Sequence, residues 1–244
     1  MCFRIFLGNT ERGKMKMKNI KLIACDIDGV LLEDTFSPVL HILAQRFNIP
    51  YTAELENNMF SQNRGKAVNY FLKQLSLSGH KESEDVLKLF FDERQKYIDK
   101  SGTPILDGVP EFISLLKNLD VKIVCYGGLD YEMIDKCFTS YLKNFDQYIC
   151  TNDFRPGLKE IVKNFYQLEY QEVLFIDDVA EVAKEAKKYS IPFIGIPSQH
   201  SWGFQKDEMT KVGTKYIVSS VKEITKEYLE RLDSDQAIWE EQDD

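Results

Sequence analysis

The chain has 244 residues, a formal net charge of −8 and 43% hydrophobic residues. This length fits one large domain or one domain with an insertion, and the hydrophobic share excludes wholesale disorder. The acidic balance argues against broad binding to nucleic acids or anionic membranes, because the long-range field of the protein repels polyanions.

The cysteine pattern and the apolar runs indicate in which cellular compartment the protein is expected. The five cysteines never approach a C-x-x-C spacing, and an odd number in a chain of this length predicts no disulfide framework. No apolar run approaches the ~18 residues that a transmembrane helix needs. We therefore expect a cytoplasmic protein without a membrane partner. Residues 1–19 are interpreted as an N-terminal extension to which the sequence assigns no function.

Short apolar runs that end in turns alternate with helical patterns along most of the chain. The runs, each predicted to be a buried strand, are residues 20–25, 121–126, 173–176 and 193–196. The helical patterns between them are residues 109–119, 157–168 and 179–189. This alternation predicts an α/β fold of Rossmann-like type, with a parallel sheet covered by helices on both faces, over residues 20–34 and 104–232.

Residues 35–103 interrupt the alternation. They contain three helical patterns, over residues 39–47, 66–75 and 84–98, and no convincing strand. We interpret them as a helical cap domain inserted after the first strand; the alternative is an elaborated connection packed on the core. Residues 233–244 carry six acidic residues and no basic one, which predicts a solvated acidic tail.

Acidic pairs follow two of the predicted strands. Asp26 and Asp28 leave the first strand, and Asp177 and Asp178 leave the third. Because ligands collect at the carboxyl ends of parallel strands, we expect these four carboxylates to converge. Such a cluster is repelled unless a hard cation fills it, and oxygen ligands favour Mg²⁺. The alternative for each pair is a helix cap, with Asp178 as the N-cap of the helix over residues 179–189.

These motifs resemble the haloacid dehalogenase superfamily of aspartate-nucleophile phosphatases. The sequence Asp-Ile-Asp-Gly at residues 26–29 is similar to its first motif, and Arg155 before Pro156 is similar to its third. Phe-Ile-Asp-Asp at residues 175–178 is similar to its acidic fourth motif. The likeness extends over roughly residues 20–230, and it implies that the inserted helices correspond to the helical cap of this family.

The resemblance implies a phosphomonoester hydrolase that acts on a small phosphorylated molecule. Asp26 would attack phosphorus and form an aspartyl-phosphate, while Asp28 would donate and accept the proton. Asp26, the main-chain carbonyl of Asp28, Asp177 and Asp178 would hold Mg²⁺, and Arg155 would be the second positive clamp on the phosphoryl group. A leaving halide needs no proton, so Asp28 favours phosphate esters over carbon–halogen bonds.

The second motif departs from the family pattern. Its Ser or Thr position falls on Gly127, which has no hydroxyl group, and Tyr126 is expected to point to the other face of its strand. The main-chain N–H groups of Gly127 and Gly128 are the expected substitutes in phosphate binding. We therefore expect a slower or narrower enzyme.

Three functional hypotheses remain open at this point. A phosphosugar mutase would use the same acids while excluding water from the aspartyl-phosphate. A catalytically silent protein that binds phosphate or serves regulation is the third hypothesis, and Gly127 motivates it. For either enzyme, Arg64 and Lys66 are candidate substrate contacts at the start of an inserted helix, with a solvated loop as the alternative.

Overall fold

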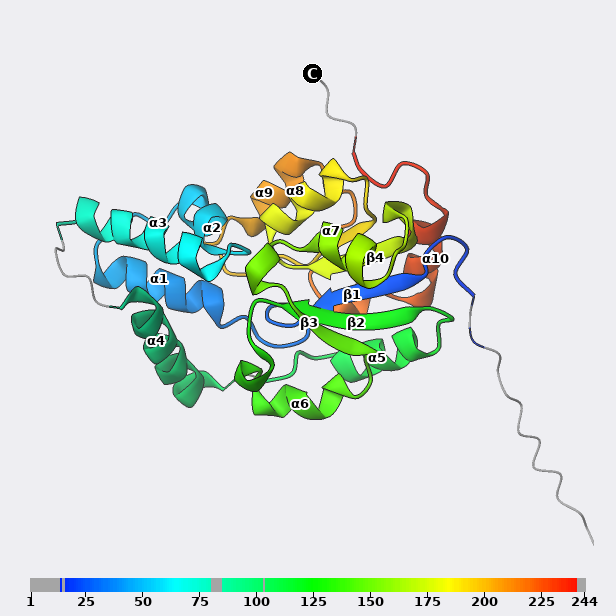
Figure 1. Cartoon of the computed structure of the whole chain (residues 1–244), viewed down its shortest axis with the longest axis horizontal. Helices are drawn as coiled ribbons and strands as arrows, with labels where there is room; N and C mark the ends of the chain where they lie inside the picture. The colour runs from blue at the N-terminus through cyan, green and yellow to red at the C-terminus, as the bar shows by residue number, and fades with distance from the viewer. Residues whose placement is uncertain (1–13, 15, 80–84, 103, 241–244) are drawn as a thin grey trace, which may run out of the picture.

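A parallel five-stranded sheet forms the centre of the protein in the computed structural model, which describes residues 14, 16–79, 85–102 and 104–240 (Figure 1). The strand order is β3-β2-β1-β4-β5, so that β1 lies in the middle. The strands are β1 (Leu22–Asp26), β2 (Lys122–Gly127), β3 (Gln147–Cys150), β4 (Val173–Asp177) and β5 (Phe193–Gly195). The predicted α/β fold with a parallel sheet is confirmed.

The strand β3 was missed by the sequence analysis. It is an edge strand of four residues that pairs only with β2, and its Gln147 is exposed while Tyr148 and Cys150 are half-buried. Strands buried on both faces give continuous apolar runs, whereas this one does not. Its position nevertheless matters, because Tyr148 lies opposite Cys125 next to the carboxyl end of β2.

Helices cover both faces of the sheet. One face packs against α5 (Val109–Lys117), α6 (Lys136–Leu142) and α10 (Lys226–Ser234). The other packs against α7 (Leu158–Glu160), α8 (Ala180–Lys188) and α9 (Gln205–Val212). The helix predicted over residues 157–168 is α7 followed directly by a π-helical turn over Ile161–Phe165. Short 3₁₀ turns occupy Tyr131–Met133, Asn152–Phe154, Tyr170–Glu172 and Val221–Glu223.

Four helices between β1 and α5 form a unit of their own, here called the helical unit, beside the carboxyl ends of the strands (Figure 1). They are α1 (Phe36–Arg46), α2 (Ala53–Met59), α3 (Arg64–Leu77) and α4 (Val86–Ser101). Buried side chains such as Leu43, Leu55 and Phe71 give the unit its own apolar core. The short helix α2 escaped the sequence analysis because Leu55 is its only buried apolar residue.

The predicted solvated tail was wrong for Asp233, which belongs to α10, and for Trp239, although Ser234, Gln236, Ala237 and Glu240 are exposed. Asp233 is buried, and its carboxylate accepts hydrogen bonds from the main-chain N–H groups of Lys18, Asn19 and Ile20. The Trp239 ring stacks on a core aromatic ring, that of Phe193, with their centroids 6.0 Å apart. The carboxylate of Asp233 is stabilised by these main-chain N–H donors, which the composition of the segment alone does not reveal.

The same contacts join Lys18 and Asn19 of the expected N-terminal extension to the core, while residues 1–13, 15 and 241–244 lie outside the described chain. Within the described residues, no helix is long and apolar enough to cross a membrane.

Candidate functional site

The two acidic pairs lie at the carboxyl ends of neighbouring strands. Asp26 is the last residue of β1 and Asp177 the last residue of β4, and both side chains are buried. Burial raises the pKa of Asp26, and repulsion from Asp177 raises it further. The pKa of Asp178 is raised for the same reasons, by burial and then by the charges of Asp177 and Asp26. These three carboxylates thus share one electrostatic environment.

The donor set suits a hard cation. Among the described residues, no three Asp, Glu, His or Cys side chains are grouped closely enough to form a metal site by themselves. Mg²⁺ normally uses only one or two carboxylates and completes its octahedral shell with water, substrate and other oxygen atoms. Buried carboxylates that repel one another fit that requirement, because a cation beside them would offset the repulsion. Asp26, Asp177, Asp178 and the main-chain carbonyl of Asp28 are therefore suitable ligands.

Asp28 lies in a different environment from the other acids. Burial raises its pKa to about 6, although the charge of Arg94 opposes this rise. A carboxyl group with a pKa near 6 can give and take protons close to neutral pH. Asp28 Oδ1 lies 3.4 Å from Arg94 Nη2, an ion pair between the end of β1 and the helix α4.

The sequence analysis missed Arg94. Its side chain is buried, and Arg94 also donates to Asp135 at 2.8 Å and to the Thr35 hydroxyl at 2.8 Å. In the sequence it stands among other charged residues of α4, where nothing separates it from a solvated arginine. Only the three-dimensional structure shows that the side chain of Arg94 reaches Asp28.

Arg155 faces the same space as the acids. Its guanidinium carbon lies 3.5 Å from the position that a β-carbon on Gly128 would occupy, and its Nη1 donates to the Thr151 hydroxyl at 3.1 Å. Its positive charge lowers the pKa of both Asp26 and Asp28, against the effect of burial. The structure therefore brings the positive charge of Arg155 close to the predicted nucleophile.

Two tyrosines occupy the region of the unusual second motif. A β-carbon on Gly127 would lie 3.2 Å from the Tyr148 hydroxyl oxygen and 3.8 Å from Asp26 Oδ1. The Tyr148 hydroxyl, which donates to the Leu129 carbonyl, thus takes part of the space that a larger residue would need. As expected, Tyr126 packs on the other face of its strand, with Val124 and Phe175, but its hydroxyl group still donates to Asp177. The length of the side chain carries this hydroxyl to the strand end.

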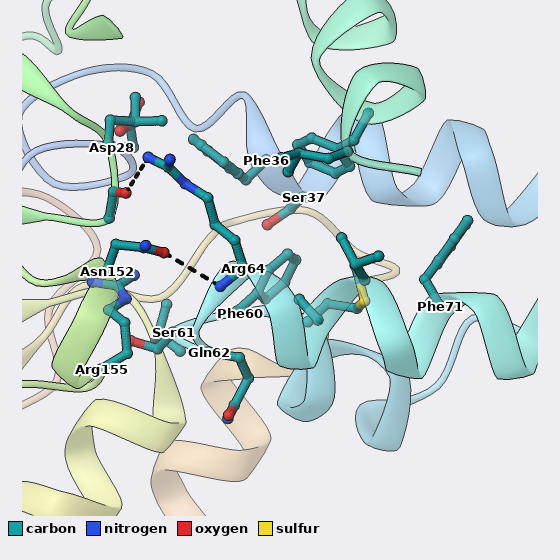
Figure 2. A pocket seen from close by; sticks show the side chains of 18 of the residues that line it. Asp28, Phe36, Ser37, Phe60, Ser61, Gln62, Arg64, Phe71, Asn152 and Arg155 are labelled. Carbon is teal, nitrogen blue, oxygen red and sulfur yellow. Dashed lines mark hydrogen bonds between the residues drawn. The ribbon is translucent and has the colours of Figure 1, made fainter. Parts of the chain in front are cut away.

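A cavity lies between the sheet end and the helical unit (Figure 2). On the sheet side its wall contains Asp26, Asp28, Gly128, Asp178 and Arg155. Most of the predicted metal ligands and phosphate contacts therefore line one cavity, whereas Asp177 and Gly127 are not part of its lining.

The two candidate substrate contacts of the helical unit differ. Arg64 lines the cavity, and its guanidinium donates to the Gly128 carbonyl at 2.8 Å and to Asp130 at 2.9 Å. Its main-chain N–H donates to the Asn152 side chain at 3.3 Å, as the dashed line in Figure 2 shows. Lys66 is exposed and does not line the cavity. Arg64 therefore joins the helical unit to the sheet end, and Lys66 takes no part.

Comparisons with known proteins agree with this geometry. A family model described as haloacid dehalogenase-like hydrolase matches residues 20–189. A search of curated proteins finds no match. Among solved structures, the chain is similar to a conserved haloacid dehalogenase-like protein of unknown function from Agrobacterium tumefaciens, with 18% identity and a TM-score of 0.63 over 84% of this chain and 96% of that one.

Two further solved structures share the fold. A predicted phosphatase from Clostridium acetobutylicum has 18% identity and a TM-score of 0.59, over 87% of this chain and 100% of that one. A predicted phosphoglycolate phosphatase from Haemophilus somnus has 16% identity and a TM-score of 0.59, over 85% of this chain and 97% of that one. At these identities the similarity shows a shared fold.

Proposed function

Because the chain belongs to the haloacid dehalogenase-like hydrolases, we propose that it is a Mg²⁺-dependent phosphomonoester hydrolase with Asp26 as the nucleophile. One observation supports this proposal most directly. The buried Asp26 lines a single cavity together with the cation of Arg155 and the carboxyls of Asp28 and Asp178. That combination provides a nucleophile, a proton donor and positive charge for a phosphoryl group.

In the first step, a carboxylate oxygen of Asp26 forms a bond to phosphorus while the ester P–O bond breaks. Asp28 gives its proton to the leaving alkoxide oxygen, which departs as the alcohol. In the second step, water attacks phosphorus, the carboxylate of Asp28 accepts a proton from that water, and the bond between Asp26 and phosphorus breaks. The net reaction converts ester and water into alcohol and inorganic phosphate, and it restores both aspartates.

The remaining residues of the site would bind the phosphoryl group and offset its negative charge. Mg²⁺ held by Asp26, Asp177, Asp178 and the carbonyl of Asp28 would supply positive charge to the phosphoryl oxygens. Arg155 would supply a second positive group with forked N–H donors. The N–H groups of Gly127 and Gly128 would add main-chain donors where the family has a hydroxyl.

The helical unit has the place of a cap in this proposal, since it closes the cavity on the side opposite to the strand ends. A closed cavity excludes bulk water and strengthens the electrostatic interactions inside it. We expect the enzyme to act in the cytoplasm on a small phosphorylated molecule, without a nucleic-acid or membrane partner, in line with its net charge of −8.

Release of phosphate from p-nitrophenyl phosphate tests the proposal. We expect turnover with Mg²⁺, loss of turnover in EDTA, and loss of at least about a thousandfold in kcat for Asp26→Asn, because the amide is not a nucleophile. Asp120→Asn is a matched control, since it removes the same charge from an exposed turn. Absence of turnover across a broad panel of phosphate esters would favour the catalytically silent protein instead, and hexose phosphate isomers as products would favour the mutase.

A further inference from the structure

The cavity has two chemically different ends. The end at the sheet carries the acids and Arg155, whereas the end at the helical unit is lined mainly by apolar side chains (Figure 2). The large apolar residues at that end are Phe36, Met59, Phe60, Phe71, Phe90 and Phe91. A phosphoryl group placed at the acids therefore directs the rest of its ester toward an aromatic surface.

The two longest polar side chains of the helical unit that border this surface, Gln62 and Arg64, are already bonded to protein. The guanidinium of Arg64 donates to Gly128 and Asp130, and the Gln62 amide donates to the Asn57 carbonyl. Among the described lining residues, two buried side-chain atoms have no partner, namely Ser61 Oγ and Asp34 Oδ2. A sugar would bring several hydroxyl groups, and most of them would be buried there without a hydrogen-bond partner.

The volume of the cavity further limits the size of the substrate that it can hold. The cavity volume is about 150 Å³, and an engineered apolar cavity of about 150 Å³ is known to accommodate benzene. Because the phosphoryl group takes part of this volume, the hydrocarbon group of the substrate is at most the size of a phenyl ring or a short alkyl group. Longer chains, fused rings and nucleosides exceed this space.

We propose that the substrate is the phosphate monoester of a compact apolar alcohol or phenol, and that its hydrocarbon group lies among the aromatic side chains of α1, α3 and α4. This inference rests on the proposed phosphomonoester hydrolase. It predicts specificity through removal of hydrocarbon surface from water, so that each added methylene group improves kcat/KM by about three- to fourfold until the cavity is full.

A series of alkyl phosphates tests this specificity at nearly constant leaving-group chemistry. We expect kcat/KM to rise at least tenfold from methyl through propyl to butyl phosphate. Propyl phosphate should exceed glycerol 1-phosphate, which has the same carbon chain with two added hydroxyl groups, by tenfold or more. A flat series, or a preference for glycerol 1-phosphate or glucose 6-phosphate, would overturn the inference while leaving the proposed hydrolase intact.

A variant of the lining tests where the hydrocarbon group lies. Met59 is half-buried, so Met59→Gln keeps the length of the side chain while making it polar. We expect the loss of kcat/KM to be at least fivefold greater for butyl phosphate than for methyl phosphate. Leu77→Gln is the control, because Leu77 is 82% exposed on α3 and lies outside the lining. An equal loss for both esters would contradict the proposed placement.

Binding without turnover separates this inference from the proposed reaction. Calorimetry with phenylphosphonate and methylphosphonate in the presence of Mg²⁺ compares the same anionic group with and without a ring. We expect phenylphosphonate to bind at least tenfold more tightly to the full chain and to Asp28→Asn. If no ester is hydrolysed but this preference holds, the hydrolase proposal fails and the apolar ligand class stands. Equal affinities would remove the apolar ligand class.

Discussion

At Gly127, a hydroxyl group from the neighbouring strand fills space beside the proposed nucleophile. A serine there would bring its β-carbon 3.2 Å from the Tyr148 hydroxyl oxygen, which is closer than most such contacts. The missing family hydroxyl and the presence of Tyr148 are therefore linked, because both side chains cannot fit without adjustment. A single substitution at either position does not test this link.

We predict that Gly127→Ser lowers the free energy of unfolding by about 1–3 kcal/mol because of this overpacking. In the Tyr148→Phe background the same change should lower the free energy of unfolding by a smaller amount, since the hydroxyl oxygen is absent. A double-mutant cycle of thermal unfolding measures the coupling. If Asp26 chemistry operates as proposed, the double variant should also show about tenfold higher kcat than Tyr148→Phe, because the serine adds one donor to the phosphoryl group. Additive destabilisation would contradict the steric link.

The positive charge of Arg94 lowers the pKa of Asp28. Burial raises the pKa of Asp28 to about 6, and Arg94 is the main opposing influence. Removal of the guanidinium in Arg94→Met should therefore raise this pKa further. A proton donor with a higher pKa stays protonated to higher pH, so the alkaline limb of the kcat/KM profile should move upward by about one pH unit or more.

The matched control for Arg94→Met is Lys96→Gln. Lys96 is an exposed cation on the same helix, and it forms an ion pair with Glu93 of that helix. It should leave the pH profile in place, because solvent screens its charge. An unchanged profile in Arg94→Met, with the variant folded by circular dichroism, would contradict control of Asp28 by Arg94.

The helix α3 is joined to the sheet end through its first residue. Arg64 donates to Gly128 and Asp130 on the loop after β2. We predict that Arg64→Ala speeds hydrogen exchange of the main chain over residues 61–77 by roughly tenfold, since charged hydrogen bonds of this kind contribute about 1.5–3 kcal/mol. Exchange of the central strands should not change. Lys66→Ala, an exposed change two residues along α3, is the control, and similar effects of both variants would contradict the role of Arg64.

For the molecule as a whole, the negative charge that the proposed function requires at Asp26 lowers the stability of the folded state. The pKa of Asp26 is raised by burial and by Asp177, so its ionisation disfavours the folded state at neutral pH. We predict that Asp26→Asn, although inactive, raises Tm in EDTA, by about 2–4 °C for each kcal/mol of relieved repulsion. The advantage should shrink as the pH falls toward 4, where the wild-type carboxyl becomes protonated in the folded state first.

Addition of Mg²⁺ should reverse this order. A cation that binds the folded state raises its Tm, and the wild type has one more charged ligand than the variant. Differential scanning calorimetry of both proteins with and without Mg²⁺ measures the effect, and Asp120→Asn serves as the surface control. If Mg²⁺ shifts neither protein, the assignment of these acids as metal ligands is wrong.

The sequence allowed prediction of the sheet centre and of the acids at its edge, because both follow from local patterns. A strand buried on both faces is a continuous apolar run, and an acidic pair after it marks the strand end. Arg94 and Tyr148 could not be found in this way. Each lies in an element with an ordinary pattern, and its role arises only where that element packs against residues distant in the chain. The apolar end of the cavity is distributed over three helices for the same reason.

The bonds of Asp233 also bear on when the molecule can assemble during its synthesis. Lys18, Asn19 and Ile20 immediately precede the central strand, yet the carboxylate that receives their N–H groups is made 213 residues after Ile20. A nascent chain still attached to the ribosome therefore lacks this anchor of the segment before its middle strand until Asp233 has emerged. The strand β1 itself pairs with β2 and β4, which are made earlier, so it is the segment before β1 that gains its buried partner last.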